Sequence, residues 1–201
     1  MQIKSILKHS VLICVLFYAS SHAQRAIVDD PINDFVEPYR DTTDVVDRDR
    51  RVLVRIFADF NNDGIRDIAL SDTYHWGNAG GGWEIYQGRQ DGRYEFLTEA
   101  FFHPLAFRLE PIKKGISKLI IYIRDNAAQG YLKEYETSSQ GFKEISSRLL
   151  KTGDESSKGH AEYWQLFGHL YKKPVSECCK LYDYIQNPKV KWQPGYYLSE
   201  K

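Results

Sequence analysis

Cysteine, methionine and unbalanced charge are all scarce in this sequence. It contains three cysteines and one methionine, and its 27 Lys and Arg residues are matched by 27 Asp and Glu residues. A chain with so few cysteines is not a disulfide-stapled scaffold. The lack of a basic excess argues against a nucleic-acid-binding surface, which needs Lys and Arg gathered on one face.

The cysteines themselves carry little information about function. Cys178 and Cys179 are adjacent and cannot join distant segments. They leave three interpretations open: a strained vicinal disulfide, a bond to another chain, or two buried thiols. We favour buried thiols, because free cysteine is commonly a core residue. Cys14 follows Ile13, where a lipoprotein signal has a small residue, so it is not predicted to carry a lipid.

Long hydrophobic runs are also missing. The one apolar run, VLICVLFYA at residues 11–19, is shorter than the roughly 20 residues that span a bilayer. It follows Lys4 and Lys8 and precedes the small residues Ser21 and Ala23. This layout is typical of a secretory signal peptide, so we expect residues 1–23 to be removed. The protein is thus predicted to be exported, to the periplasm or the medium, with no membrane insertion of its mature form.

The remaining chain is expected to form an N-terminal arm followed by one domain. Residues 24–51 are rich in Asp, Pro and Arg and have no sustained period, which predicts an irregular arm on the surface. Residues 52–201 are predicted to form a compact, mainly β, antiparallel domain. Its first unit, 52–102, alternates polar and apolar residues between turn signals, which is typical of strands. The expected strands are 52–60, 67–72, 82–88 and 93–102.

A second unit, residues 103–150, resembles the first at an offset of about 50 residues. Gly115 then aligns with Gly64, but Lys114 and Lys118 occupy positions that are acidic in the first unit. The last part, residues 151–201, is rich in Tyr and Trp. Frequent β-forming residues favour strands there, with a helix possible between Glu162 and Ile185.

The most informative stretch is the acidic turn ADFNNDGIRD in the first unit. Calcium prefers six to eight oxygen ligands, and alternating side chains of a short loop can supply them around a glycine that permits the sharp turn. The loop is not an EF-hand, because Leu70 occupies the position of the closing Glu and the flanks read as strands. The alternative is an ordinary turn rich in Asx residues that never binds metal. The candidate side-chain ligands are Asp59, Asn61, Asp63 and Asp67, and the candidate carbonyl ligand is that of Ile65.

The turn, together with the later segment WEIYQGRQDGRYEF, resembles one FG-GAP/VCBS-type repeat, the blade unit of integrin-α-like β-propellers. The resemblance covers about residues 52–96. It implies that the loop binds Ca²⁺ between two strands of a blade through the five residues just named. One good copy and one degenerate copy are too few for a closed propeller, so a compact domain of about two blade-like, four-stranded units is expected.

No motif for catalysis stands out, and the protein is predicted not to be an enzyme. The first hypothesis is an exported, calcium-stabilised β domain that binds or scaffolds an unknown protein or glycan. The C-terminal aromatic residues are either core residues or a sugar-binding face. The alternative is a secreted hydrolase or carbohydrate-active protein with a calcium-supported cleft. In that case His75, Trp76 and His103 are expected to converge with Asp72 in one pocket.

Overall fold

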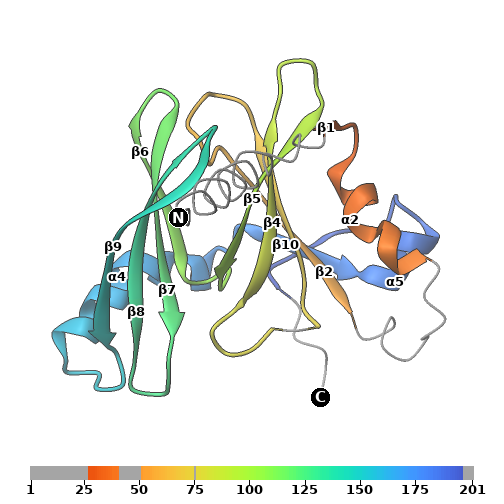
Figure 1. Ribbon diagram of the computed structural model, residues 1–201. Helices are drawn as coiled ribbons and strands as arrows, with labels where there is room; N and C mark the ends of the chain where they lie inside the picture. The colour runs from red at the N-terminus through yellow and green to blue at the C-terminus, as the bar shows by residue number, and fades with distance from the viewer. Residues whose placement is uncertain (1–26, 41–50, 75, 197–201) are drawn as a thin grey trace, which may run out of the picture.

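The computed structural model describes residues 27–40, 51–74 and 76–196 (Figure 1). The expected signal peptide, residues 1–23, lies outside the described residues, as do Cys14 and His75. The described helices include none that is long and apolar enough to cross a membrane.

Two antiparallel sheets form most of the domain (Figure 1). The larger has the strand order β1-β5-β4-β3-β2-β10-β11, and the smaller has the order β6-β7-β8-β9. Each sheet therefore contains a four-stranded meander in sequence order, β2 to β5 in one and β6 to β9 in the other. The strands are β1 (Ile27–Val28), β2 (Val52–Ala58), β3 (Asp67–Asp72), β4 (Gly81–Gly88), β5 (Tyr94–Phe102), β6 (Phe107–Lys113), β7 (Ile116–Arg124), β8 (Gln129–Ser138), β9 (Gly141–Lys151), β10 (Ser176–Lys180) and β11 (Gln193–Pro194).

The mainly β fold class is confirmed, and the four strands expected in the first unit correspond to β2 to β5. The expectation of an irregular N-terminal arm is wrong for its central part. Pro31–Arg40 forms the helix α2, which Asp30 begins by accepting hydrogen bonds from the backbone N–H groups of Ile32 and Asn33. The helix buries Ile32 and Val36 on one side. This apolar stripe is short, and the many charged residues around it make the segment resemble an irregular one when only its composition is considered.

The preference for strands in the C-terminal part is wrong for two segments. Lys158–Lys172 forms the helix α4, and Leu181–Gln186 forms the helix α5, with only β10 and β11 as strands around them. Ser157 caps α4 by accepting a hydrogen bond from the N–H of His160. Phe167 and Leu170 are buried on one side of α4, so helical spacing outweighs the β preference of its aromatic residues.

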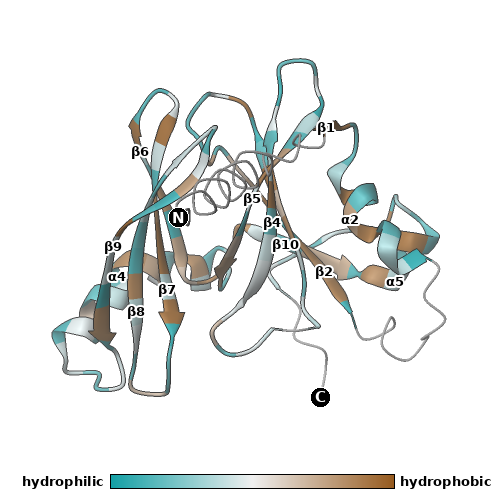
Figure 2. Cartoon of the chain, in the orientation of Figure 1, coloured by the Kyte–Doolittle hydropathy of each residue, from teal (hydrophilic) through white to brown (hydrophobic). Residues whose placement is uncertain are grey.

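The core has two parts, one on each face of the seven-stranded sheet. One face packs on the smaller sheet and on α4 around Trp83, Phe102 and Leu119. The opposite face packs on α2 and α5 around Leu70 and Leu181. Figure 2 shows the corresponding hydrophobic residues along β2 and β7 and more hydrophilic ones where the hairpins turn.

Candidate functional site

The acidic turn lies between β2 and β3 and is tightly wound. Asn62 has φ 54° and Gly64 has φ 90°, both in the left-handed region that most L-residues avoid. Asn and Gly, which occupy positions 62 and 64, are two of the residues that tolerate this conformation. The turn therefore has the local geometry that the D-x-N-x-D-G pattern predicts.

Carboxylates of the turn hold its own backbone. Asp59 accepts hydrogen bonds from the N–H groups of Asp63 at 3.1 Å and Gly64 at 2.9 Å. Asp63 in turn accepts one from the N–H of Ile65 at 2.7 Å. The Asp63 bond spans two residues, as in an Asx turn, whereas those of Asp59 span four and five residues. The side chains of both residues therefore hold the backbone of the loop.

Asp67 is wholly buried at the base of the loop. Its two oxygens accept hydrogen bonds from the N–H groups of Phe60 at 2.7 Å and Gly88 at 2.9 Å, which join the end of β2 to the end of β4. Burial raises the pKa of Asp67 to about 7, the two N–H bonds oppose that rise, and the nearby charges of Asp63 and Asp59 add to it. The three carboxylates are thus close enough to repel one another.

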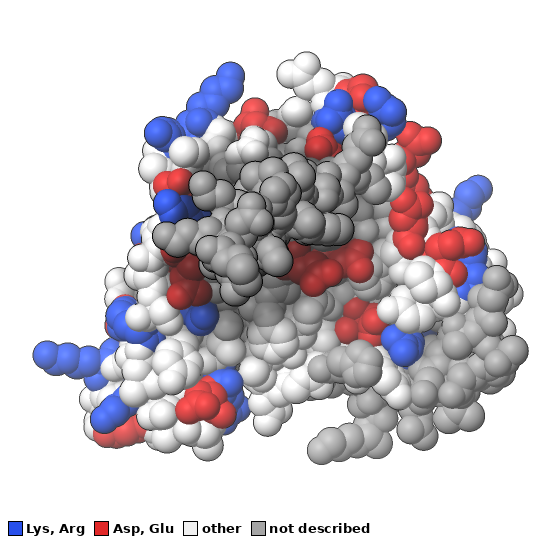
Figure 3. Space-filling model, viewed as in Figure 1, with Lys and Arg blue, Asp and Glu red and all other residues white. Residues whose placement is uncertain are grey.

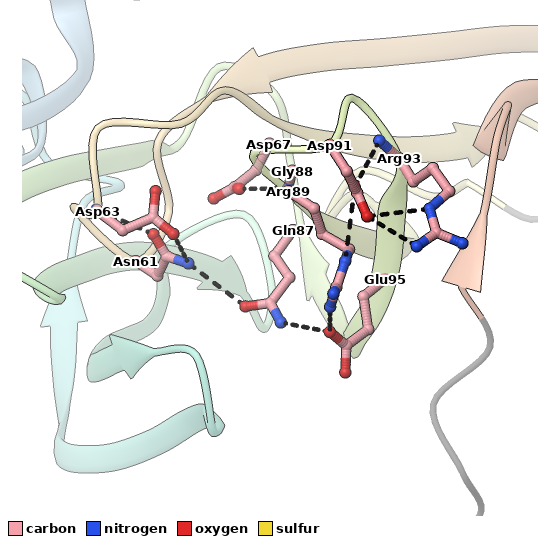
Figure 4. Close-up of polar contacts among 9 residues, drawn as sticks. All are labelled: Asn61, Asp63, Asp67, Gln87, Gly88, Arg89, Asp91, Arg93 and Glu95. Atoms are coloured by element: carbon pink, nitrogen blue, oxygen red, sulfur yellow. Dashed lines mark hydrogen bonds and ion pairs between the residues drawn. The ribbon is translucent and has the colours of Figure 1, made fainter.

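Asn61 connects the loop to the β4–β5 hairpin (Figure 4). Its buried amide donates to Asp63 at 3.0 Å and to Gln87 at 3.4 Å. Gln87 donates to Glu95, which also accepts from Arg89 at 2.8 Å. Sequence reasoning missed Gln87 and Gly88, because their role depends on the pairing of β3 with β4.

The donor set of the loop suits calcium in its chemistry. All the predicted ligands offer oxygen atoms, and an ionised carboxylate has about four acceptor sites, so one hydrogen bond per oxygen leaves capacity for a cation. In the described part of the chain, no three Asp, Glu, His or Cys side chains already form a group arranged to hold a metal ion. Four of the five predicted residues lie in the turn and Asp67 is the first residue of β3, and the three carboxylates accept hydrogen bonds from backbone N–H groups.

The loop also contacts the smaller sheet. The Asn62 side-chain amide donates to the carbonyl of Lys113 at 2.8 Å, and the N–H of Gly115 donates to the carbonyl of Asn62 at 2.7 Å. The hydroxyl of Thr137 on β8, also buried, donates to the carbonyl of Phe60. The acidic turn therefore lies at the junction of the two sheets.

The corresponding hairpin of the second unit, β6–β7, has an ion pair on its strands. Lys118 lies 2.9 Å from Glu110, and the two residues are cross-strand partners. A lysine ammonium thus neutralises a carboxylate in the unit where the acidic pattern is lost.

The side chains proposed for a hydrolytic cleft do not all converge. Asp72 and Trp76 both line a groove of about 570 Å³, whereas His103 is not among its lining residues. Asp72 accepts hydrogen bonds from Tyr39 at 3.0 Å and from Arg51 at 3.2 Å, so its carboxylate fastens α2 and the start of β2. The expectation that Asp72, Trp76 and His103 converge in one pocket is therefore wrong.

His103 has an aromatic environment. Its ring lies 4.9 Å from that of Tyr196 and 6.2 Å from that of Trp76, between centroids. Its Nδ1 accepts a hydrogen bond from the N–H of Leu105. Burial lowers the pKa of His103 to about 4, so the imidazole is neutral at physiological pH.

The groove has a feature that the sequence did not reveal. Glu84 on β4 and Glu99 on β5 are direct cross-strand partners, and both line it beside Phe35 of α2 and Phe101. Within the described ranges, neither carboxylate forms an ion pair with Lys or Arg. Figure 3 shows acidic side chains near the middle of this face of the molecule, with most Lys and Arg nearer its rim.

The cysteine pair lies in the interior. Cys178 and Cys179 on β10 are buried, and they face the two different core clusters because successive side chains of a strand point to opposite faces. Burial, with a smaller contribution from Cys178, raises the pKa of Cys179 to about 12. Burial of both side chains favours the interpretation as two buried thiols.

Comparisons with known proteins found no similarity. No protein-family model matches the chain, and neither the curated proteins nor the solved structures include a significant match.

Proposed function

We propose that this chain is an exported β domain, stabilised by one calcium ion, with a binding or scaffolding role outside the cytoplasm. The observation that carries the proposal is the position of the acidic turn at the junction of the two sheets, where Asn62 and Phe60 contact the β6–β7 hairpin and β8. A cation bound there would offset the repulsion of three carboxylates and so stabilise the turn that contacts the smaller sheet. The ligands would be the side chains of Asp59, Asn61, Asp63 and Asp67 and the carbonyl of Ile65.

The same argument supports a mainly structural role for calcium. The turn connects β2 and β3, and Asp67 at its end bonds to β4 through the N–H of Gly88. The FG-GAP/VCBS-type resemblance supports the same site, and the two four-stranded meanders agree with its blade-like units. An affinity on the order of 10⁻⁴ to 10⁻³ M would suit an extracellular module.

The test is thermal unfolding of the chain from Gln24, in chelator and in millimolar calcium. We expect calcium to raise the melting temperature of the wild type and to have little effect on Asp63→Ala. The matched control is Asp154→Ala, because Asp154 also accepts bonds from a nearby backbone N–H and hydroxyl, those of Ser156, far from the turn. A wild-type melting temperature that is the same in chelator and in calcium would contradict the calcium site.

Export has its own test. Mass spectrometry of the protein secreted by its native host is expected to find Gln24 as the first residue, as cleavage after Ala23 requires. Retention of residues 1–23 in the isolated protein would contradict this part of the proposal.

A second candidate is the carbohydrate-active enzyme, and one observation favours it. Two carboxylates flanking a sugar bond are the usual machinery of glycoside hydrolysis, and Glu84 and Glu99 face each other in an aromatic-lined groove. Hydrolysis of aryl glycosides by the wild type, with loss in both Glu84→Gln and Glu99→Gln, would support this reading. Wild-type activity that survives both substitutions would assign the hydrolysis to other residues and so remove this groove as the active site.

A further inference from the structure

A second, smaller pocket lies between the helix α4 and the end of β7. It has a volume of about 220 Å³, the size of a single sugar ring rather than of a folded segment. Its lining combines aromatic rings with polar groups, a composition typical of small-molecule sites. The residues used in the argument are Tyr122, Arg124, Thr152, His160, Trp164 and Tyr171.

The aromatic side of the pocket is an exposed strip along α4. Trp164 is 44% exposed and Tyr171 is 46% exposed, and their ring centroids lie 5.0 Å apart. His160 is one helical turn before Trp164, at 6.1 Å between centroids. Spacings of 4 and 11 residues bring these three side chains onto one side of the helix, where they border the buried side that holds Phe167 and Leu170. Large rings left open to water in contact with one another form a surface suited to stacking against a ligand.

The polar side of the pocket has unused hydrogen-bonding capacity. Arg124 donates from Nε to the carbonyl of Asn126 at 3.1 Å, and among the described residues its guanidinium forms no ion pair. Its two terminal amino groups have the fork geometry that binds a carboxylate through two parallel bonds. Nδ1 of His160 lies 3.1 Å from the carbonyl of Thr152, which can only accept, so Nδ1 donates to it and Nε2 is the ring nitrogen left for a ligand.

These groups narrow the class of ligand. An organic cation, which aromatic cages often bind, is disfavoured because Arg124 lines the pocket and no Asp or Glu does. A wholly apolar ligand would displace water from the exposed guanidinium without replacing its hydrogen bonds, which disfavours such a ligand. A ring with an apolar C–H face, hydroxyls at its edge and one carboxylate satisfies every group.

We infer that this pocket binds a uronic acid residue of an acidic polysaccharide, with the sugar ring against Trp164 and Tyr171 and its carboxylate on Arg124. The inference rests on the binding role proposed above and names the ligand class as an acidic glycan. The pocket shares no residue with the acidic turn, so the two proposals can fail separately.

The test is calorimetric titration of the chain from Gln24 with trigalacturonate, with its neutral methyl ester and with adenosine monophosphate. We expect trigalacturonate to bind and the ester to bind about tenfold more weakly or worse, because the ester cannot form the charged bidentate contact. Equal binding of acid and ester, tighter binding of the nucleotide, or no binding of trigalacturonate would overturn the inference.

Two variants and two controls locate the site. Arg124→Gln and Trp164→Ala are each expected to weaken trigalacturonate binding about tenfold or more. Lys143→Gln removes an exposed charge on β9, and Tyr131→Ala removes an exposed ring on β8, and both are expected to bind normally. Arg124 is exposed, so its variant tests the site even where Trp164→Ala unfolds. Normal binding by Arg124→Gln, or equal losses in the controls, would overturn the assignment.

A final arm separates the two proposals. The titration is repeated in chelator at a temperature well below the melting transition. Binding that persists there supports the pocket whatever the outcome of the calcium test, whereas binding that depends on calcium directly would place the glycan at the acidic turn and overturn the pocket.

Discussion

The side-chain amide of Asn62 donates a hydrogen bond of 2.8 Å to the carbonyl of Lys113, 51 residues further along the chain. Asn62 lies between the first two strands of one meander, and Lys113 ends the first strand of the other, so the first turns of the two meanders contact each other directly. The N–H of Gly115 completes the contact by donating to the carbonyl of Asn62. The junction of the two sheets is thus built from the turns themselves, and its bonds can be tested one at a time.

Thr137 is the buried side chain at this junction. Its hydroxyl donates to the carbonyl of Phe60 and lies 3.2 Å from that of Ser117. Thr137→Val keeps the shape and removes the donor, so we expect the free energy of unfolding to fall by about 1–3 kcal/mol. Urea unfolding monitored by circular dichroism measures the loss. Thr137→Ser retains the hydroxyl and should lose less, and a Val variant as stable as the wild type would show that the bond is not needed.

Asp67 is expected to have a graded effect on stability, measured in chelator. Asp67→Ala leaves the buried N–H groups of Phe60 and Gly88 without acceptors, each costing about 1–3 kcal/mol. Asp67→Asn retains one carbonyl oxygen, so it can accept one of the two bonds well and should lose less than Ala. Equal stabilities of the two variants would show that the two hydrogen bonds of the carboxylate, which join β2 to β4, do not contribute to stability.

His103 should make stability depend on pH. Its folded pKa, lowered by burial to about 4, lies below the ordinary value of 6.5, so the unfolded chain binds a proton in this window while the folded chain does not. Stability from this group is present above pH 6.5 and is lost as the pH falls towards about 4. The aromatic rings in contact with the His103 imidazole are those of Trp76 and Tyr196, and neither side chain is charged near neutral pH.

The measurement is the free energy of unfolding in urea at several pH values between these limits. His103→Gln cannot titrate, and its stability should fall less on acidification than that of the wild type. His169→Gln, which removes an exposed histidine on α4, serves as the control and should follow the wild type. Parallel pH profiles for wild type and His103→Gln would refute the assignment.

The buried thiols should be unreactive in the folded protein. Burial raises the pKa of Cys179 to about 12, so the thiolate is scarce at neutral pH, and Cys178 is only 2% exposed. We expect a thiol reagent to label neither residue of the chain from Gln24 until denaturant is added, and both afterwards. A dimer band on a non-reducing gel that disappears with reductant would instead favour the intermolecular bond.

Much of the first unit could be predicted from the sequence because its signals are local. Alternation over β2 and the Asx-Gly pattern before Asp67 both act within a few residues, and β2 to β5 follow from such signals. The helix α2 was missed although Ile32 and Val36 lie at helical spacing, because its charged residues dominate the composition. In α4, aromatic residues with β preference occupy a helix whose capping residue, Ser157, is the informative signal.

What could not be predicted depends on strand register and on contacts between sheets. The role of Gly88 at Asp67 follows only from the pairing of β3 with β4. Glu84 pairs with Glu99 because the strand register shifts between Ile85 and Tyr86, where Leu97 of β5 is left without a partner on β4. No local pattern reports such a shift.

The opposed pair itself leads to the last prediction. Like charges directly across an antiparallel pair are destabilising, and a cross-strand pair is worth about 0.2–1 kcal/mol. Glu84 accepts a hydrogen bond of 2.6 Å from Tyr86, so Glu99 is the partner that can be neutralised with the least disturbance. We expect Glu99→Gln to raise the free energy of unfolding by a few tenths of a kcal/mol up to about 1 kcal/mol, more at low salt than at high salt.

Glu155→Gln, which removes an exposed carboxylate from a loop, is the control and should change stability little. A groove that keeps two opposed carboxylates at the expense of stability is better explained by binding or catalysis than by folding, and a destabilised Glu99→Gln variant would remove that argument.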